Sequence, residues 1–218
     1  FHRAAQRLAS ARDAEVSVRT LEQLKESALP ENRQALGSAL EIFTSILGHH
    51  RALPQRTLDA ISGLLVESST AVRAWTIPGD GSKAMADGLE KLYRRGRKAG
   101  KRAAETPTTE RLHKWRRTTK ELWSALRLLR TFDDKHLDCL TKAARDLGEL
   151  LGDDHDLAVL GDGLGHEQVS VKLGKQPIEH INQVIAAERK RLQRKAWKLG
   201  KVLYEEKPKK LRQRIREL

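Results

Sequence analysis

Apolar residues in the first part of the chain recur every three or four positions, which is the spacing of amphipathic α-helices. We expect three helices here, over residues 1–29, 30–47 and 54–75, followed by a turn at the Thr-Ile-Pro-Gly-Asp-Gly sequence 76–81. The Arg12-Asp13 dipeptide either lies within the first helix or divides it into two.

The second part of the chain has the same periodicity. One helix is expected to start at residue 82, and the next follows the Pro-Thr-Thr-Glu sequence at 107–110, with Thr106 as the expected N-cap. Further helices are expected over about 135–151, 157–164, 177–206 and 209–218, with an acidic segment at 152–156 and a loop at 165–177.

The composition agrees with an all-α fold. Ala and Leu are abundant, whereas aromatic residues make up only 4% of the chain, which favours helices over sheets. The single cysteine, Cys139, excludes an intrachain disulfide, and no Cys/His spacing suggests zinc. No apolar run approaches the roughly 18–20 residues of a membrane-spanning helix. We therefore expect a cytoplasmic protein that does not enter a membrane.

Positive charge is concentrated in residues 91–130, which contain 14 Lys/Arg and three Glu, a net charge of +11, when the whole chain has +13. Within this segment apolar residues recur at helical spacing, and a second stripe of the same helix is basic. The basic stripe consists of His113, Arg116, Arg117, Lys120 and Arg127. A helix that packs on one side and presents cations on the other predicts a site for a polyanion, whether nucleic acid, an anionic membrane or a phosphate polymer.

Two other predicted helices are also basic, and we expect all three to converge on one groove. Their cations are Arg94, Arg95, Arg97, Lys98 and Lys101 in one helix, and Arg189, Arg191, Lys195, Lys198 and Lys201 in the other. Gly96 and Gly100 lie on one side of the first of these helices. Because each glycine costs about 1 kcal/mol in a helix interior, the pair indicates close approach of a neighbouring helix or a ligand, or a loosely formed helix end.

An internal repeat is indicated by residues 8–16, which align without gaps to residues 151–159. The two segments share three identities in nine residues, which suggests a duplicated helical hairpin. We therefore expect residues 1–78 to be the remainder of a first repeat and residues 79–218 to be the second. The first repeat lacks a counterpart of the His113 helix, which we expect to precede Phe1.

Four segments in this order resemble the CHAD family, the conserved-histidine α-helical domain: residues 8–16, 93–97, 113–120 and 151–157. The resemblance extends over nearly the whole chain. It implies two antiparallel four-helix bundles related by a pseudo-twofold axis, with a basic pore between them that binds inorganic polyphosphate. His113, Arg116, Arg117 and Lys120 match the family signature, whereas Trp123 stands where a further Arg is common. Association with polyphosphate granules in the cytoplasm is a further expectation.

Two of these residues have structural alternatives. His113 is either a half-buried hydrogen-bonding group beside Trp115 or a donor to phosphate in a cationic groove, where Arg116 and Arg117 would lower its pKa. Arg12 is favoured as the partner of Asp13 in an ion pair, with polyphosphate binding as the alternative role.

Catalytic and metal-binding alternatives are less well supported. The sequence Asp153-Asp154-His155-Asp156 resembles the HD phosphohydrolases, but the further metal ligands of that class cannot be assembled. Glu110 and His113 form half of a di-iron motif that must occur twice, and it occurs once. No nucleophile triad or phosphate-binding glycine loop is present. We expect a non-catalytic module without metal or cofactor that binds polyphosphate. Nucleic acid is the main alternative ligand, expected to bind only non-specifically, and a metal-dependent phosphohydrolase is the weaker alternative function.

Overall fold

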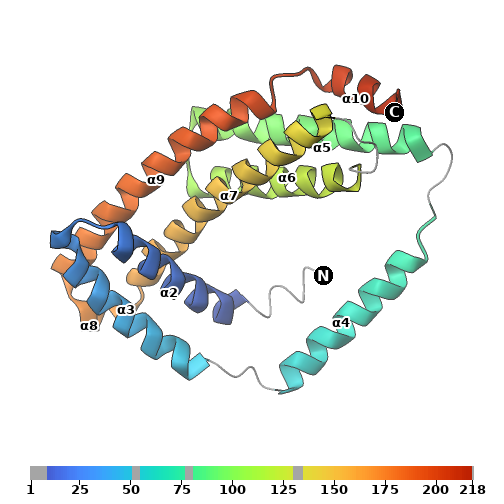
Figure 1. Cartoon of the computed structure of the whole chain (residues 1–218). Helices are drawn as coiled ribbons and strands as arrows, with labels where there is room; N and C mark the ends of the chain where they lie inside the picture. Colours follow the sequence, from blue (N-terminus) through green and yellow to red (C-terminus); the bar gives the residue numbers. More distant parts are fainter. Residues whose placement is uncertain (1–8, 51–54, 77–80, 130–134, 218) are drawn as a thin grey trace. The chain divides into compact units, whose positions relative to one another are not determined.

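The computed structural model of the chain describes residues 9–50, 55–76, 81–129 and 135–217. Within these ranges nine helices are present and no strand (Figure 1), so the predicted all-α fold is confirmed. The chain divides into two compact units, a first unit of residues 1–76 and 156–187 and a second unit of residues 77–155 and 188–218. The paired four-helix bundles and the division into repeats at residue 78 stay predictions.

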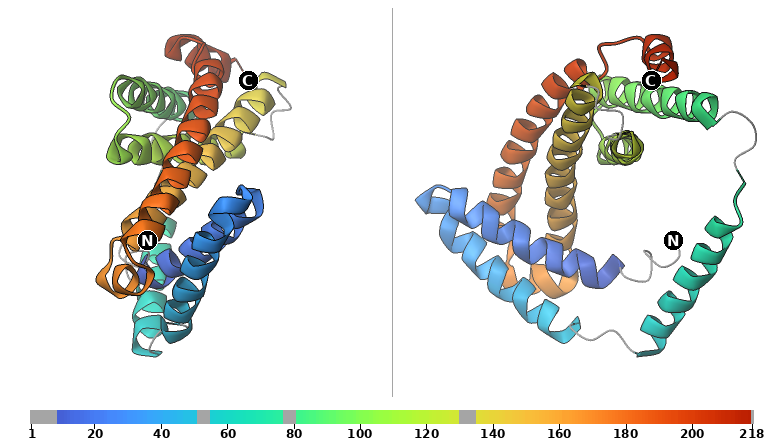
Figure 2. Two further views of the ribbon diagram at one scale, coloured as in Figure 1. Left: turned by 90° about the vertical axis from the view of Figure 1, so that its left-hand side faces the viewer. Right: turned by 45° about the vertical axis from the view of Figure 1, so that its right-hand side comes forward.

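The helices of the first unit are α2 (Ala9–Ser27), α3 (Pro30–His50), α4 (Gln55–Arg73), α8 (Glu167–Leu173) and parts of α7 (Lys135–Leu164) and α9 (Lys175–Leu203). α2 packs along α3 (Figure 2), and α3 also packs against α8. Leu21 of α2 and Leu36 of α3 are fully buried, as the apolar spacing of these two helices predicts.

The second unit contains α5 (Gly81–Glu105), α6 (Thr109–Leu128), α10 (Pro208–Arg216), the first part of α7 and the last part of α9. α5 packs against both α6 and α10. The apolar stripe predicted for α6 is buried in the core of this unit, with Trp115 and Leu122 among its members. The burial of this stripe leaves the opposite side of α6 available for the basic residues.

The glycines of α5 allow two aromatic side chains to approach its backbone. A Cβ atom at Gly96 would lie 2.3 Å from the Tyr204 hydroxyl oxygen, and one at Gly100 would lie 2.9 Å from the Trp115 indole. Gly200 of α9 contacts the same indole, since its Cβ would lie 2.6 Å from Trp115. Of the alternatives for Gly96 and Gly100, the structure therefore supports close packing of neighbouring side chains.

α7 is a single helix where the sequence predicted an interruption. Residues 152–156 contain one glycine and three aspartates, which have low helix propensity, and the predicted helix therefore stopped before them. Leu151 and Leu157, on either side of this segment, are buried, and Asp154 is held by two side chains of α9. Contacts of this kind outweigh propensity differences of less than about 1 kcal/mol per residue.

Two other boundaries differ from the prediction. Residues 165–177, expected as a loop, contain α8, in which Val169 and Leu173 lie four residues apart and are both buried. Gly174 ends α8 with a φ of 82°, a conformation that favours glycine. The N-cap of α6 is Thr108 rather than Thr106, and its hydroxyl oxygen accepts a hydrogen bond of 3.3 Å from the Arg111 amide.

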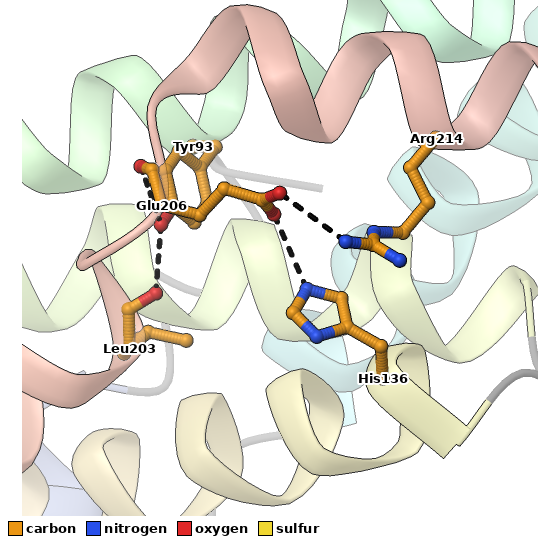
Figure 3. A network of polar contacts seen from close by, with 5 residues as sticks. All are labelled: Tyr93, His136, Leu203, Glu206 and Arg214. Atoms are coloured by element: carbon orange, nitrogen blue, oxygen red, sulfur yellow. Dashed lines mark hydrogen bonds and ion pairs between the residues drawn. The ribbon is translucent and has the colours of Figure 1, made fainter.

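The end of α9 and the start of α10 are held by a network of polar contacts (Figure 3). The Tyr93 hydroxyl lies 2.9 Å from the carbonyl oxygen of Leu203 and 3.1 Å from that of Glu206. The Glu206 carboxylate lies 3.2 Å from Nε2 of His136 and 3.4 Å from Nη2 of Arg214. Tyr93 of α5 thus satisfies a carbonyl group that the end of α9 leaves without a helical partner, and side chains of α7 and α10 hold the Glu206 carboxylate.

Candidate functional site

The two long faces of α6 differ in burial and in charge. Trp115 and Thr119 are almost completely buried on one face, with 2% and 0% exposure. His113, Arg117 and Lys120 are exposed on the other face, and Arg116 between them is half-buried. We call these four residues the His113 face. Because successive helical residues are rotated by about 100°, the His113 face lies opposite Trp115.

Three residues of the His113 face meet α7 in reverse order, as antiparallel helices require. The rings of His113 and His155 have centroids 4.5 Å apart. A Cβ atom at Gly152 would lie 3.6 Å from Nε of Arg116, and one at Gly148 would lie 3.7 Å from Cγ of Lys120. The two glycines of α7 therefore leave room for these basic side chains to lie across the helix.

His113 is surrounded by groups that disfavour its protonation. Partial burial lowers its pKa below the ordinary value of 6.5, and the charges of Arg116 and Arg117 lower it further. The lowering predicted from the neighbouring arginines is confirmed, although burial is the larger cause. A neutral imidazole still donates one hydrogen bond, and an anion bound beside it favours the charged form, which donates two.

Arg189 is held in a largely buried ion pair. Its guanidinium donates to both carboxylate oxygens of Asp154, at 3.1 and 3.3 Å, and to the Thr109 hydroxyl at 3.3 Å. Asp154 is only 2% exposed and also accepts a hydrogen bond of 2.8 Å from Gln193. This arrangement connects α7 with α9 and places Arg189 beside the first turn of α6.

Several other predicted cations have acidic or aromatic partners. Arg95 lies 3.0 Å from Glu121, and Arg117 lies 3.9 Å from the same carboxylate. Arg94 pairs with Glu90, Arg191 pairs with Glu188, and Arg127 lies 5.0 Å from the ring centroid of Trp123. The positive charge of the paired residues is partly neutralised within the protein, which weakens the electrostatic attraction of each residue for a bound anion.

The remaining predicted cations of the second unit are exposed and have no ion pair with a described residue: Arg97, Lys98, Lys101, Lys195, Lys198 and Lys201. Three of them, Arg97, Lys101 and Lys201, line a pocket together with Trp115. Since Trp115 lies on the buried face of α6, this pocket and the His113 face are on different sides of that helix.

Arg12 lies on α2 in the first unit, where its side chain is exposed. The expected ion pair with Asp13 is absent from the described residues. Asp13 instead lines a pocket of about 410 Å³ with Asp162 and His166.

The α7 partners of the His113 face were not predicted from the sequence. The sequence indicates His155 and Gly152 only as members of the segment 151–157, with His155 also a candidate metal ligand, and it indicates no role for Gly148. The signal was nevertheless present, because residues 113, 116 and 120 have the spacing of residues 155, 152 and 148 read in reverse. Such a match is recognisable only once α7 is known to be a continuous neighbour of α6.

The family model described as CHAD domain matches residues 1–165 of the chain, which is well over half of it. The chain belongs to the CHAD family. The part matched to the CHAD domain includes α5, α6 and α7 with the whole His113 face, whereas α8, α9 and α10 follow it. Comparisons with curated proteins and with solved structures gave no match.

Two acidic residues of α7 in this CHAD domain, Asp154 and Asp156, have separate partners. Asp154 pairs with Arg189, whereas Asp156 lies 3.5 Å from Arg19 of α2. Among the described residues no group of three or more His, Cys, Asp or Glu side chains is arranged to hold a metal ion. In the same part of the chain, no helix combines the length and the hydropathy needed to cross a membrane.

Proposed function

We propose that this CHAD domain binds inorganic polyphosphate through the His113 face of α6, without catalysing a reaction. The observation that supports the proposal is the arrangement of this face, in which His113, Arg116 and Lys120 lie across α7 at His155, Gly152 and Gly148. Packing against α7 reduces the conformational freedom of these side chains before a ligand arrives, and less entropy is therefore lost on binding.

The residue types suit a phosphate chain. An arginine guanidinium can donate two parallel hydrogen bonds to one phosphate, whereas a lysine ammonium acts as a point charge that tolerates several positions of the chain. Repeated phosphates along the polymer can then occupy the face in several registers. Each contact is modest and is screened by salt, so the affinity depends on the number of phosphates bound at once.

The surroundings of the His113 face favour polyphosphate over nucleic acid as the ligand. Proteins that bind single strands without sequence preference use exposed aromatic rings on which the bases stack. Near the His113 face the tryptophans of α6 do not offer such a surface, because Trp115 is buried on the opposite side and Arg127 covers the ring of Trp123. A nucleic acid would therefore gain little from its bases and would bind through its phosphates alone.

We propose that the protein binds polyphosphate in the cytoplasm and in polyphosphate granules there.

A competition experiment tests the choice of ligand. Labelled single-stranded DNA or RNA is bound to the full chain at about 0.15 M salt, where non-specific binding to nucleic acid is weak. Long-chain polyphosphate should then displace it at a far lower phosphate concentration than nucleic acid displaces labelled polyphosphate. Equal competition, phosphate for phosphate, would show that the face binds polyanions without preference and would refute the assignment.

A triple variant tests the site. Replacing Arg116, Arg117 and Lys120 with alanine should weaken polyphosphate binding strongly and leave the helical circular dichroism intact. A control variant with the same change of charge replaces Arg56, Lys172 and Lys175, which are exposed in the first unit, and should bind nearly as well as the unchanged protein. Added EDTA should not affect either protein. Loss of binding in EDTA would instead support a metal-dependent site.

A further inference from the structure

A pocket of about 400 Å³ lies in the second unit, on the side of α6 opposite the His113 face. Its walls come from α5, α6, α9 and the residues just after α9. The side chains that matter for its chemistry are Arg97, Lys101, Trp115, Trp197, Lys201 and Tyr204. Its volume is within the range of about 300–1,000 Å³ that is typical of sites for small molecules.

The floor of this pocket is rigid. Trp115 is only 2% exposed, and its indole is seated against Gly100 and Gly200, where no larger residue would fit without a shift. Tyr204 packs edge-on against Tyr93, and its hydroxyl lies 3.3 Å from that of Thr119. Burial raises the pKa of Tyr204 to about 12, so its hydroxyl keeps its proton at neutral pH. The pocket is therefore formed before any ligand binds.

The polar groups around the floor favour an anion. Arg97, Lys101 and Lys201 are exposed cations without an ion pair to any described residue, and the only carboxylate among the described lining residues is Glu205. The indole Nε1 of Trp197 is buried and has no acceptor within the part of the chain that the structure describes.

We propose that this pocket is a second binding site, for a small molecule that joins a flat aromatic ring to an anionic group. The ring would lie against the partly exposed indole of Trp197, over the buried Trp115, and the anionic group would pair with the cations at the rim. A nucleoside monophosphate has both features and is the probe that we choose. The proposal does not depend on polyphosphate binding, because the two sites are on different sides of α6.

Polyphosphate itself fits this pocket less well than an aromatic anion does. A phosphate chain would satisfy Arg97, Lys101 and Lys201 but would leave the exposed part of the Trp197 indole in contact with water. Apolar contact with the rings is the part of the binding free energy that an inorganic polymer cannot supply. A quaternary ammonium ligand, which aromatic pockets also bind, is disfavoured by three cations against one carboxylate.

The indole N–H signals of the full chain provide a direct readout, because the protein has four tryptophans. In ¹⁵N-¹H correlation spectra, adenosine monophosphate should shift the signals of Trp115 and Trp197 and leave those of Trp75 and Trp123 in place. Adenosine and inorganic phosphate, each containing one half of the ligand, should bind at least about tenfold more weakly than the joined molecule. If either half binds as well as adenosine monophosphate, or if the shifts occur at Trp75 or Trp123, the proposal is wrong.

Two pairs of variants distinguish the pocket from its surroundings. Lys201→Ala and Trp197→Leu should each weaken adenosine monophosphate binding about fivefold or more. Their controls, Lys198→Ala on the same helix and Trp123→Leu on α6, should leave it unchanged. Lys201→Ala changes an exposed residue, so its result does not depend on whether Trp197→Leu folds. Equal binding by Lys201→Ala and the unchanged protein would contradict the proposal.

Competition with polyphosphate separates this proposal from the previous one. Saturating long-chain polyphosphate should leave the Trp197 signal in its ligand-shifted position, and the Arg116, Arg117 and Lys120 triple variant should still bind adenosine monophosphate. If polyphosphate displaces the nucleotide from the pocket, the pocket is part of the polyphosphate-binding site and is not a second site. Failure of polyphosphate to bind at all would leave the nucleotide result unaffected.

Discussion

The rings of His113 and His155 lie with their centroids 4.5 Å apart and their planes inclined by 46°. Each ring comes from a different helix, and Arg116 and Arg117 add positive charge beside the first of them. Protonation of His113 is disfavoured by its partial burial and by these two arginine charges. A bound polyanion favours the protonated form, so proton uptake and ligand binding are coupled at His113.

Polyphosphate binding should tighten as the pH falls from about 8 to about 5.5. Burial and the two arginines lower the pKa of His113 in the free protein, and a bound phosphate raises it again. The additional binding free energy is therefore fully present below the pKa of the free protein and is lost as the pH rises through the pKa of the complex. Titration calorimetry at several pH values measures the effect. His113→Gln should flatten the profile, whereas His180→Gln, an exposed control in the first unit, should not.

Substitution of the glycines next to Trp115 should destabilise the protein. Alanine normally stabilises a helix relative to glycine by about 1 kcal/mol. At Gly100 the new Cβ would lie 2.9 Å from the Trp115 indole, and overpacking of this kind typically costs about 1–3 kcal/mol. Gly88→Ala is the matched control, because Gly88 lies in the same helix and a Cβ atom there would have no neighbouring atom within 4 Å. Urea denaturation should show Gly100→Ala less stable and Gly88→Ala slightly more stable than the unchanged protein.

The two stripes of α6 could be predicted from the sequence because each depends only on helical periodicity. Trp115 and Leu122 repeat at helical spacing and are buried, and His113 and Lys120 repeat on the opposite side and are exposed. Periodicity gives the direction of a side chain from its own helix. It gives no partner on another helix, which is why the contact between His113 and His155 was missed.

The role of Arg189 illustrates the same limit. In the sequence it is one of several cations on a basic helix, and nothing distinguishes it from Arg191 two residues later. In the structure Arg189 pairs with the buried Asp154, whereas Arg191 pairs with Glu188 on the surface of its own helix. Distinguishing a buried partner from a surface partner requires the packing of α7 on α9. The same packing explains why Asp154 lies within a continuous helix and not at a helix end.

Arg189→Ala should destabilise the fold by about 3 kcal/mol, because it leaves the buried carboxylate of Asp154 without its cation. Gln193 still donates to that carboxylate, which places the cost at the lower end of the usual range. Arg191→Ala, which removes an exposed pair, should change the free energy of unfolding by less than about 1 kcal/mol. Chemical denaturation of both variants and of Asp154→Asn provides the comparison. Equal stabilities of the two arginine variants would show that the Arg189 pair is not buried in solution.

The space above Gly152 should determine whether Arg116 can reach a phosphate chain. A Cβ atom at this position would lie 3.6 Å from Nε of Arg116, which is an ordinary contact, so Gly152→Ala should fold and bind polyphosphate normally. A leucine side chain would extend into the volume that the Arg116 side chain occupies and would displace its guanidinium. We expect Gly152→Leu to weaken polyphosphate binding about three- to tenfold, comparable to the loss of one exposed cation. Gly63→Leu, at an exposed position in α4 where a Cβ atom would have no neighbour within 4 Å, is the control and should bind as the unchanged protein does.

A double variant that combines Gly152→Leu with Arg116→Ala tests whether the leucine acts through Arg116. If leucine acts only by displacing Arg116, the double variant should bind no more weakly than Arg116→Ala alone. Additive losses would show that Gly152 influences binding by another route, and undiminished binding by Gly152→Leu would remove Arg116 from the proposed site.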